Sequence, residues 1–221
     1  KVFKFGGASI NSIDRIKNVA SIIQSFHGEK LLIVISAMGK TTNALEAVVN
    51  AFFEGRQDDA LLLFKQIKDN HRTTLKYLTN LQWQKAESQL NDFFTEIEWL
   101  LHDKPVRNYD YYYDQVVCCG ELFSSSILAN YLKEINIKAE WADVRDIVRT
   151  DDNFRDAGVD WLFTEKSIRE NITPLFNEAD VVITQGFIGA TDENESTTLG
   201  REGSDFSAAI FANLLPAESV T

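Results

Sequence analysis

Residues 31–38, LLIVISAM, form a continuous apolar run near the start of the chain. A strand that is apolar along its whole length must be covered on both faces, which is typical of the interior of a parallel sheet. The run is too short to cross a bilayer, so a buried strand is the better interpretation. Segments with helical periodicity alternate with strand-like segments along the rest of the chain. The sequence therefore predicts an α/β fold with a mostly parallel sheet.

The expected elements follow one another in the order of βαβ units. We expect strands at 1–5, 31–36, 138–142 and 180–185, and helices at about 12–26, 110–133, 164–177 and 204–214, with two or three long helices within 42–104. Ligands of such sheets bind beyond the carboxyl ends of the strands. The loops after the expected strands, 6–9, 36–43, 142–146 and 185–191, are polar and rich in glycine. We therefore expect these four loops to meet at one edge of the sheet.

The composition limits the partners of the chain. Its 221 residues are 44% hydrophobic, which is enough for a sizeable core. A formal net charge of −11 repels phosphate backbones and anionic lipid, so neither nucleic acid nor a membrane is expected as a partner. No signal peptide opens the chain, and the adjacent Cys118 and Cys119 are expected to be free thiols. These features predict a cytoplasmic location.

Several apparent motifs do not hold. The Gly39–Thr41 triplet GKT is typical of a phosphate-binding P-loop, but that pattern requires glycine at position 34, where Val34 stands. The histidines His27, His71 and His102 lie far apart and are expected to be solvated or capping residues, with no spacing suited to zinc. The tyrosine-rich stretch 109–114 is expected to contribute buried helix aromatics.

The stretch KFGG at 4–7 ends the first expected strand. Gly6 and Gly7 allow the backbone N–H groups to point outward and attract phosphate oxygens. Lys4 stands between two phenylalanines, where an ammonium group is costly without a counter-anion. A solvated edge strand followed by a plain turn is an equally good interpretation of these residues alone.

The stretch TTLGREGSDFSAA at 197–209 places unusually dense polar chemistry before a helix. Arg201 can pair bidentately with a carboxylate or a phosphate. Ser204 and Asp205 are both suited to cap the following helix, and Thr42 is similarly suited to cap the helix after residue 42. Capping needs only one residue, so this stretch is expected to bind a ligand as well.

Together these segments resemble the aspartate kinases of the amino acid kinase family. The resemblance rests on KFGGAS (4–9), VISAMGKTTN (34–43), CGELFS (119–124), TQGFIGAT (184–191) and TTLGREGSDFSAA (197–209). It implies a three-layer αβα sandwich with a helical insertion at about 42–133. It also implies an ATP-dependent phosphotransferase that converts the side-chain carboxylate of L-aspartate to 4-phospho-L-aspartate, the first step towards lysine, threonine and methionine.

The resemblance also assigns roles to residues. Lys4 and Asp205 are the implied catalytic pair. The implied ATP phosphate-binding residues are Lys4, Phe5, Gly6, Gly7 and Ser9, and the implied aspartate-binding residues are Ser36, Thr42, Glu121, Phe187, Thr198, Arg201 and Ser204. Arg201 would hold the substrate α-carboxylate and Glu121 its α-ammonium group. Mg²⁺ would arrive with ATP, and no metal site of the protein itself is expected. Ala8 and Glu202 depart from the family's usual Thr and Gly.

The resemblance further implies that residues 1–221 are the N-terminal, aspartate-binding part of a catalytic domain. The family's remaining nucleotide-binding segment and its regulatory ACT domains are expected to lie outside this sequence, and the protein is expected to be a homo-oligomer. Two alternatives stay open. One is another kinase of the family, acting on acetylglutamate, glutamate or uridylate, and the other is a non-catalytic amino-acid-binding module.

Overall fold

The computed structural model describes residues 1–221, and its centre is a four-stranded parallel sheet. The strands lie in the order β1 (Val2–Phe5), β2 (Leu31–Ile35), β4 (Val181–Gln185) and β3 (Ala139–Trp141), with every pairing parallel. All five residues of β2 are buried, as its continuous apolar sequence predicts. The expected α/β fold with a mostly parallel sheet is confirmed.

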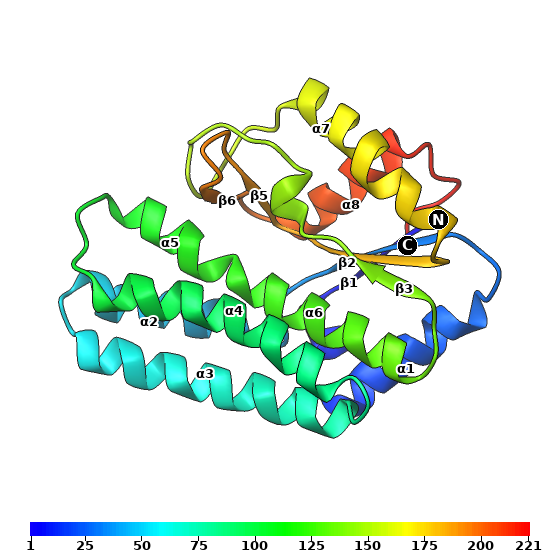
Figure 1. The fold of residues 1–221 in the computed structure, drawn as a ribbon. Helices are drawn as coiled ribbons and strands as arrows, with labels where there is room; N and C mark the ends of the chain where they lie inside the picture. Colours follow the sequence, from blue (N-terminus) through cyan, green and yellow to red (C-terminus); the bar gives the residue numbers. More distant parts are fainter.

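Helices cover both faces of this sheet. The helices are α1 (Ile13–Ser25), α2 (Thr41–Phe53), α3 (Gln57–Leu78), α4 (Trp83–His102), α5 (Tyr109–Val117), α6 (Cys119–Glu134), α7 (Trp161–Ser167) and α8 (Gly203–Leu214). Figure 1 shows α1 to α6 on one side of the sheet and α7 with α8 on the other. The predicted three-layer arrangement is therefore present, and α2 to α6 are the helical insertion. None of these helices combines the length and apolar character needed to cross a bilayer.

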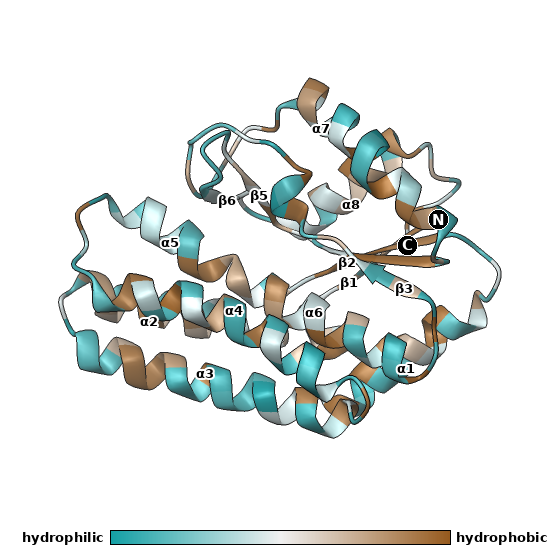
Figure 2. Cartoon of the chain, viewed as in Figure 1, coloured by the Kyte–Doolittle hydropathy of each residue, from teal (hydrophilic) through white to brown (hydrophobic).

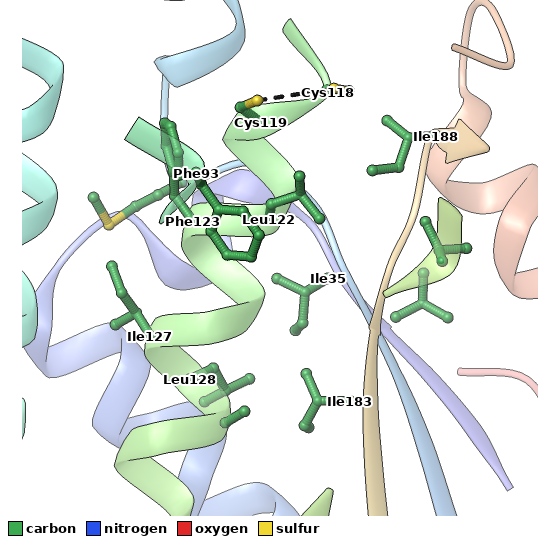
Figure 3. Packing of buried hydrophobic residues seen from close by; sticks show 14 of the residues in the cluster. Ile35, Phe93, Cys118, Cys119, Leu122, Phe123, Ile127, Leu128, Ile183 and Ile188 are labelled. Carbon is green, nitrogen blue, oxygen red and sulfur yellow. Dashed lines mark hydrogen bonds between the residues drawn. The ribbon is translucent and has the colours of Figure 1, made fainter. Parts of the chain in front are cut away.

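The centre of the core lies between α6 and the sheet. Thirteen of the sixteen residues of α6 are buried. In Figure 3, Leu122 and Leu128 of α6 lie towards Ile35 and Ile183 of the sheet, and Ile127 lies on the other side of this helix. Figure 2 shows the strands at the centre of the sheet in the colours of hydrophobic residues. Because α6 is surrounded by protein, polar side chains on it need partners inside the molecule.

The structure corrects several expected elements. The helix expected at 110–133 is two helices that meet at Cys118, and the helix expected at 164–177 is α-helical only to Ser167, followed by a wider turn and a 3₁₀ segment. The expected polar loop after residue 185 contains an antiparallel hairpin of β5 (Ile188–Ala190) and β6 (Ser196–Thr198). These strands have three residues each, too few for a recognisable alternation of polar and apolar residues.

The expectation for His71 is wrong. Its side chain is fully buried, with Nδ1 2.8 Å from the carbonyl oxygen of Ile67 and the ring edge against Phe123. Burial lowers the pKa of His71 to about 4, so the imidazole is neutral at pH 7. The reason is that α3 packs against α2, α4 and α6, so the face that carries position 71 points into the core.

The packing between the long helices predicts a strong dependence of stability on Leu90. Leu90 of α4 is fully buried, whereas Leu62 of α3 is 58% exposed. Leu90→Ala should lower the free energy of unfolding by about 2–5 kcal/mol because it leaves a cavity. The matched Leu62→Ala should change it by less than about 0.5 kcal/mol. Urea unfolding followed by circular dichroism measures both, and equal losses would contradict this description of the core.

Candidate active site

A cavity of about 440 Å³ opens at the carboxyl ends of β1, β2 and β4. Its walls come from the loops after these three strands, from α5 and α6, and from the start of α8. The lining residues are Lys4, Gly7, Ser36, Ala37, Gly39, Thr42, Tyr113, Glu121, Arg155, Phe187, Thr198, Gly200, Arg201, Glu202, Gly203, Ser204 and Asp205. Ten of the thirteen residues predicted for the site are among them.

The loop 142–146 was expected at this edge but does not line the cavity. Its Val144 N–H donates to the Gln185 side chain, and Arg145 pairs with Asp143 and with Glu96 of α4. These contacts hold the loop beside the sheet and against α4. Three of the four expected loops therefore meet at the site.

Lys4 and Asp205 lie together at one end of the cavity. The Lys4 Nζ is 2.8 Å from Asp205 Oδ1, with the lysine side chain 23% exposed and the aspartate side chain 66% exposed. A pair this open to solvent contributes little to stability. The strand β1 thus presents an ammonium group whose position is set by the first turn of α8.

The other residues predicted for phosphate binding divide into two groups. Gly7 lines the cavity, whereas Phe5, Gly6 and Ser9 do not. Gly7 is needed for a close approach, because a Cβ at this position would lie 2.5 Å from the carbonyl oxygen of Ala37. The two loops after β1 and β2 can therefore touch only when residue 7 is glycine.

Glu121 places a carboxyl group in the buried wall of the cavity. Its Oε1 accepts the Ala37 N–H at 3.0 Å, and its Oε2 has no hydrogen-bond partner in the protein. Burial raises the pKa of Glu121 to about 8, only partly offset by these backbone hydrogen bonds. A cationic group in the cavity would satisfy Oε2 and favour the ionised form.

Arg201 is an exposed residue of the cavity lining. Its guanidinium group forms no ion pair with any carboxylate of the protein, so it is free to bind an anion. The capping roles considered for Ser204 and Asp205 are wrong. The residue that precedes α8 is Glu202, in the left-handed conformation with φ 59°, and no side chain caps this helix.

The remaining predicted residues also face the cavity. Thr42 does not cap α2, because the helix already begins at Thr41 and Lys40 precedes it without a side-chain cap. Ser36 follows β2, and Phe187 follows β4 with φ 72°, held by a hydrogen bond from its N–H to the Ser207 hydroxyl. Thr198 ends β6.

Several residues of the site were not predicted from the sequence, and three of them carry polar side chains that matter for its structure. Tyr113 and Arg155 line the cavity, and the Arg155 guanidinium carbon lies 4.4 Å from the centre of the Tyr113 ring. Asp114 lies behind the wall, fully buried and hydrogen-bonded to Thr198. Asp114 and Glu121 lie on different helices, α5 and α6, so their spacing in sequence did not reveal that both belong to the site.

The fold and these motifs have counterparts in known proteins. Residues 1–221 match the amino acid kinase family over their whole length. The chain belongs to this family. It is 32% identical over 226 residues to the bifunctional aspartokinase/homoserine dehydrogenase 1, chloroplastic, of Arabidopsis thaliana, covering 100% of this chain and 24% of the relative. It is 33% identical over 220 residues to the lysine-sensitive aspartokinase 3 of Escherichia coli K12, covering 99% of this chain and 47% of the relative.

Solved structures agree with this assignment. The crystal structure of E. coli aspartokinase III in complex with aspartate and ADP (R-state) superposes with a TM-score of 0.82 and 31% identity. That match covers 99% of this amino acid kinase chain and 47% of the other chain. The chain thus spans 24% to 47% of the length of these relatives.

The buried Glu121 predicts a characteristic dependence of stability on pH. Its pKa is raised from an ordinary 4.5 to about 8, so between these values the folded state holds a proton that the unfolded state has lost. Stability therefore falls as pH rises through this window. Asp114, with its pKa raised to about 6, contributes a similar fall only below pH 6.

Glu121→Gln should therefore gain stability relative to the unmodified protein as pH rises from 6 to 8. Urea unfolding at several pH values measures this difference. Glu193→Gln, at an exposed position, is the control and should show no such trend. A constant difference between Glu121→Gln and the unmodified protein would contradict the assigned protonation state.

Proposed function

We propose that this chain forms the aspartate-binding and phosphate-binding part of an aspartate kinase. The observation that carries the proposal is that one small cavity is lined by two polar groups without partners in the protein. These groups are the Oε2 oxygen of Glu121 and the guanidinium group of Arg201. A free α-amino acid carries an ammonium group and a carboxylate that complement these two groups. The E. coli relative crystallised with aspartate and ADP has the same fold and supports the same substrates here.

The reaction needs charge neutralisation more than proton transfer. An aspartate side chain with an ordinary pKa near 3.9 is ionised at pH 7, so no general base is required. The carboxylate oxygen attacks the γ-phosphorus of ATP, and the bond to the β–γ bridging oxygen breaks to release ADP. Both reactants are negative, so catalysis consists mainly of positioning and of countering charge.

Lys4 is suited to counter that charge. Its ammonium group lies near Gly6 at the end of β1, and Asp205 at 2.8 Å holds it in place. We assign Lys4 to the β- and γ-phosphate oxygens of ATP and Asp205 to the orientation of Lys4. We assign Mg²⁺ to ATP, as part of the substrate.

The cavity argues against the alternative functions. Uridylate and acetylglutamate carry no free α-ammonium group, so neither would satisfy the buried Glu121 Oε2. A module that only binds amino acids has no use for the Lys4–Asp205 pair at the mouth of the cavity. Glutamate has both groups and differs from aspartate only by one methylene, so binding measurements must separate the two.

Binding of L-aspartate tests the proposal on this chain. Calorimetry should give a dissociation constant in the micromolar to millimolar range for L-aspartate, and no binding of N-acetyl-L-aspartate, which lacks the ammonium group. Arg201→Ala should weaken binding by roughly 30-fold or more, because it removes one partner of a charged pair. Arg56→Ala, on the surface between α2 and α3, should not. Tighter binding of uridylate or acetylglutamate than of aspartate would refute the proposal.

Lys4 should affect transfer and not aspartate binding. In the purified protein that carries this chain, Lys4→Ala should lower kcat for hydroxylamine-trapped aspartyl phosphate by roughly 100-fold or more, by analogy with the loss of an oxyanion donor. The affinity for aspartate should change little. A strong loss of aspartate affinity with unchanged kcat would show that Lys4 binds the acceptor instead.

A further inference from the structure

Asp114 of α5 is a buried carboxylate that lies behind the cavity wall. Both of its oxygens are used within the protein. Oδ2 accepts the N–H of Arg155 at 2.9 Å and the N–H of Thr198 at 2.8 Å, and Oδ1 accepts the Thr198 hydroxyl at 2.7 Å. Asp114 is therefore fixed from two segments that are far from it in sequence.

These contacts join three parts of the wall. Besides Asp114, the neighbouring Gln115 donates to the Ser196 carbonyl oxygen at 2.8 Å and accepts the Ser196 N–H at 3.0 Å. The Ala157 N–H donates to the Thr198 carbonyl oxygen at 3.0 Å. Asp114 and Gln115 of α5 thus form hydrogen bonds with the edge of β6 that does not pair with β5. Asp114 also holds the loop around Arg155 next to this edge.

The hydrogen bond from the Thr198 hydroxyl to Asp114 has a chemical consequence. A hydroxyl group has one hydrogen, and Thr198 donates it to Oδ1 of Asp114. Thr198 is a buried residue of the cavity wall, and any further hydrogen bond to its Oγ1 can therefore only be one that this oxygen accepts. An acceptor suits an ammonium group, which has three donors, and repels a carboxylate.

We infer that Asp114 is a positioning residue for substrate selection, which orients the Thr198 hydroxyl as an acceptor for the α-ammonium group of the substrate. Glu121 and Thr198 both line the cavity and would share the donors of that group. This inference rests on the proposed aspartate site. According to this inference, the Asp114–Thr198 pair and Glu121 together make the site bind an amino acid more tightly than a dicarboxylate without an amino group.

Asparagine at position 114 cannot replace the carboxylate. Its single oxygen can accept from either the Thr198 hydroxyl or the two backbone N–H groups. In the first case its NH₂ group faces the backbone N–H donors. In the second case the NH₂ group donates to Thr198 Oγ1, and the hydroxyl hydrogen no longer points to residue 114. Asp110, one helical turn earlier on α5, gives a matched control. It is 51% exposed and pairs only with the Arg155 guanidinium, at 3.2 Å.

The test compares L-aspartate with succinate, the same dicarboxylate without the amino group. Calorimetry on the unmodified chain should show a clear preference for L-aspartate. Asp114→Asn should reduce that preference by about tenfold or more, the loss expected when a hydrogen bond to a charged group is removed, while succinate affinity changes little. Asp110→Asn should keep the preference. Thr198→Val, which removes only the hydroxyl, should lose it as Asp114→Asn does.

The possible outcomes separate the two proposals. If the unmodified chain does not prefer L-aspartate, the proposed function fails and this inference fails with it. If it does, but Asp114→Asn and Thr198→Val weaken both ligands equally or neither, only the inference is overturned. Should Asp114→Asn fail to fold, as its far-ultraviolet circular dichroism would show, Thr198→Val alone decides.

Discussion

The carboxyl group of Glu121 is the constraint on which the site depends. Burying a carboxyl group is costly unless its oxygens are paired, and only one of these oxygens has a partner in the protein. The free energy cost of burial is smaller for the neutral, protonated carboxyl group than for the carboxylate. For this reason burial raises the pKa of Glu121. A ligand with an ammonium group would offset the remaining cost. The buried wall of the cavity is therefore complementary to a cationic group of a ligand.

The architecture keeps this carboxyl group in place. Glu121 is on α6, the helix that packs on the sheet with almost no exposed residues. Gly120 and Ala37 bring this helix and the loop after β2 into contact, since a Cβ at Gly120 would lie 3.0 Å from that of Ala37. The parallel sheet then adds Lys4 from the neighbouring strand. The contacts that pack α6 on the sheet therefore also fix the position of Glu121 in the cavity.

Much of this arrangement can be predicted from the sequence, for physical reasons. The strands β1, β2 and β4 are short apolar runs between polar loops, and parallel strands bring the loops at their carboxyl ends to one edge. Lys4 could be found because a charge within an apolar segment needs a partner, and Arg201 because of the dense polar residues around it, whereas Glu121 was named only through the family resemblance. The assignment of their roles rested on family resemblance, and those roles remain proposals.

What the sequence could not show depends on contacts between distant segments. The hairpin of β5 and β6 has strands too short to be recognised, and α5 stabilises it through Asp114 and Gln115. His71 appears polar in sequence but is buried because α3 is enclosed by other helices. In the sequence Asp114 is one acidic residue in a tyrosine-rich stretch, and its partner Thr198 lies far away along the chain. Each depends on tertiary packing, which local periodicity does not encode.

Proton release on binding tests the account most directly. At pH 7 the free protein should hold a proton on Glu121, whose pKa is about 8, and the bound ammonium group should displace it. Titration calorimetry of L-aspartate in buffers of different ionisation enthalpy should show release of about one proton per ligand. Glu121→Gln should show none. Binding without any buffer dependence in the unmodified protein would contradict the central role given to this buried carboxyl group.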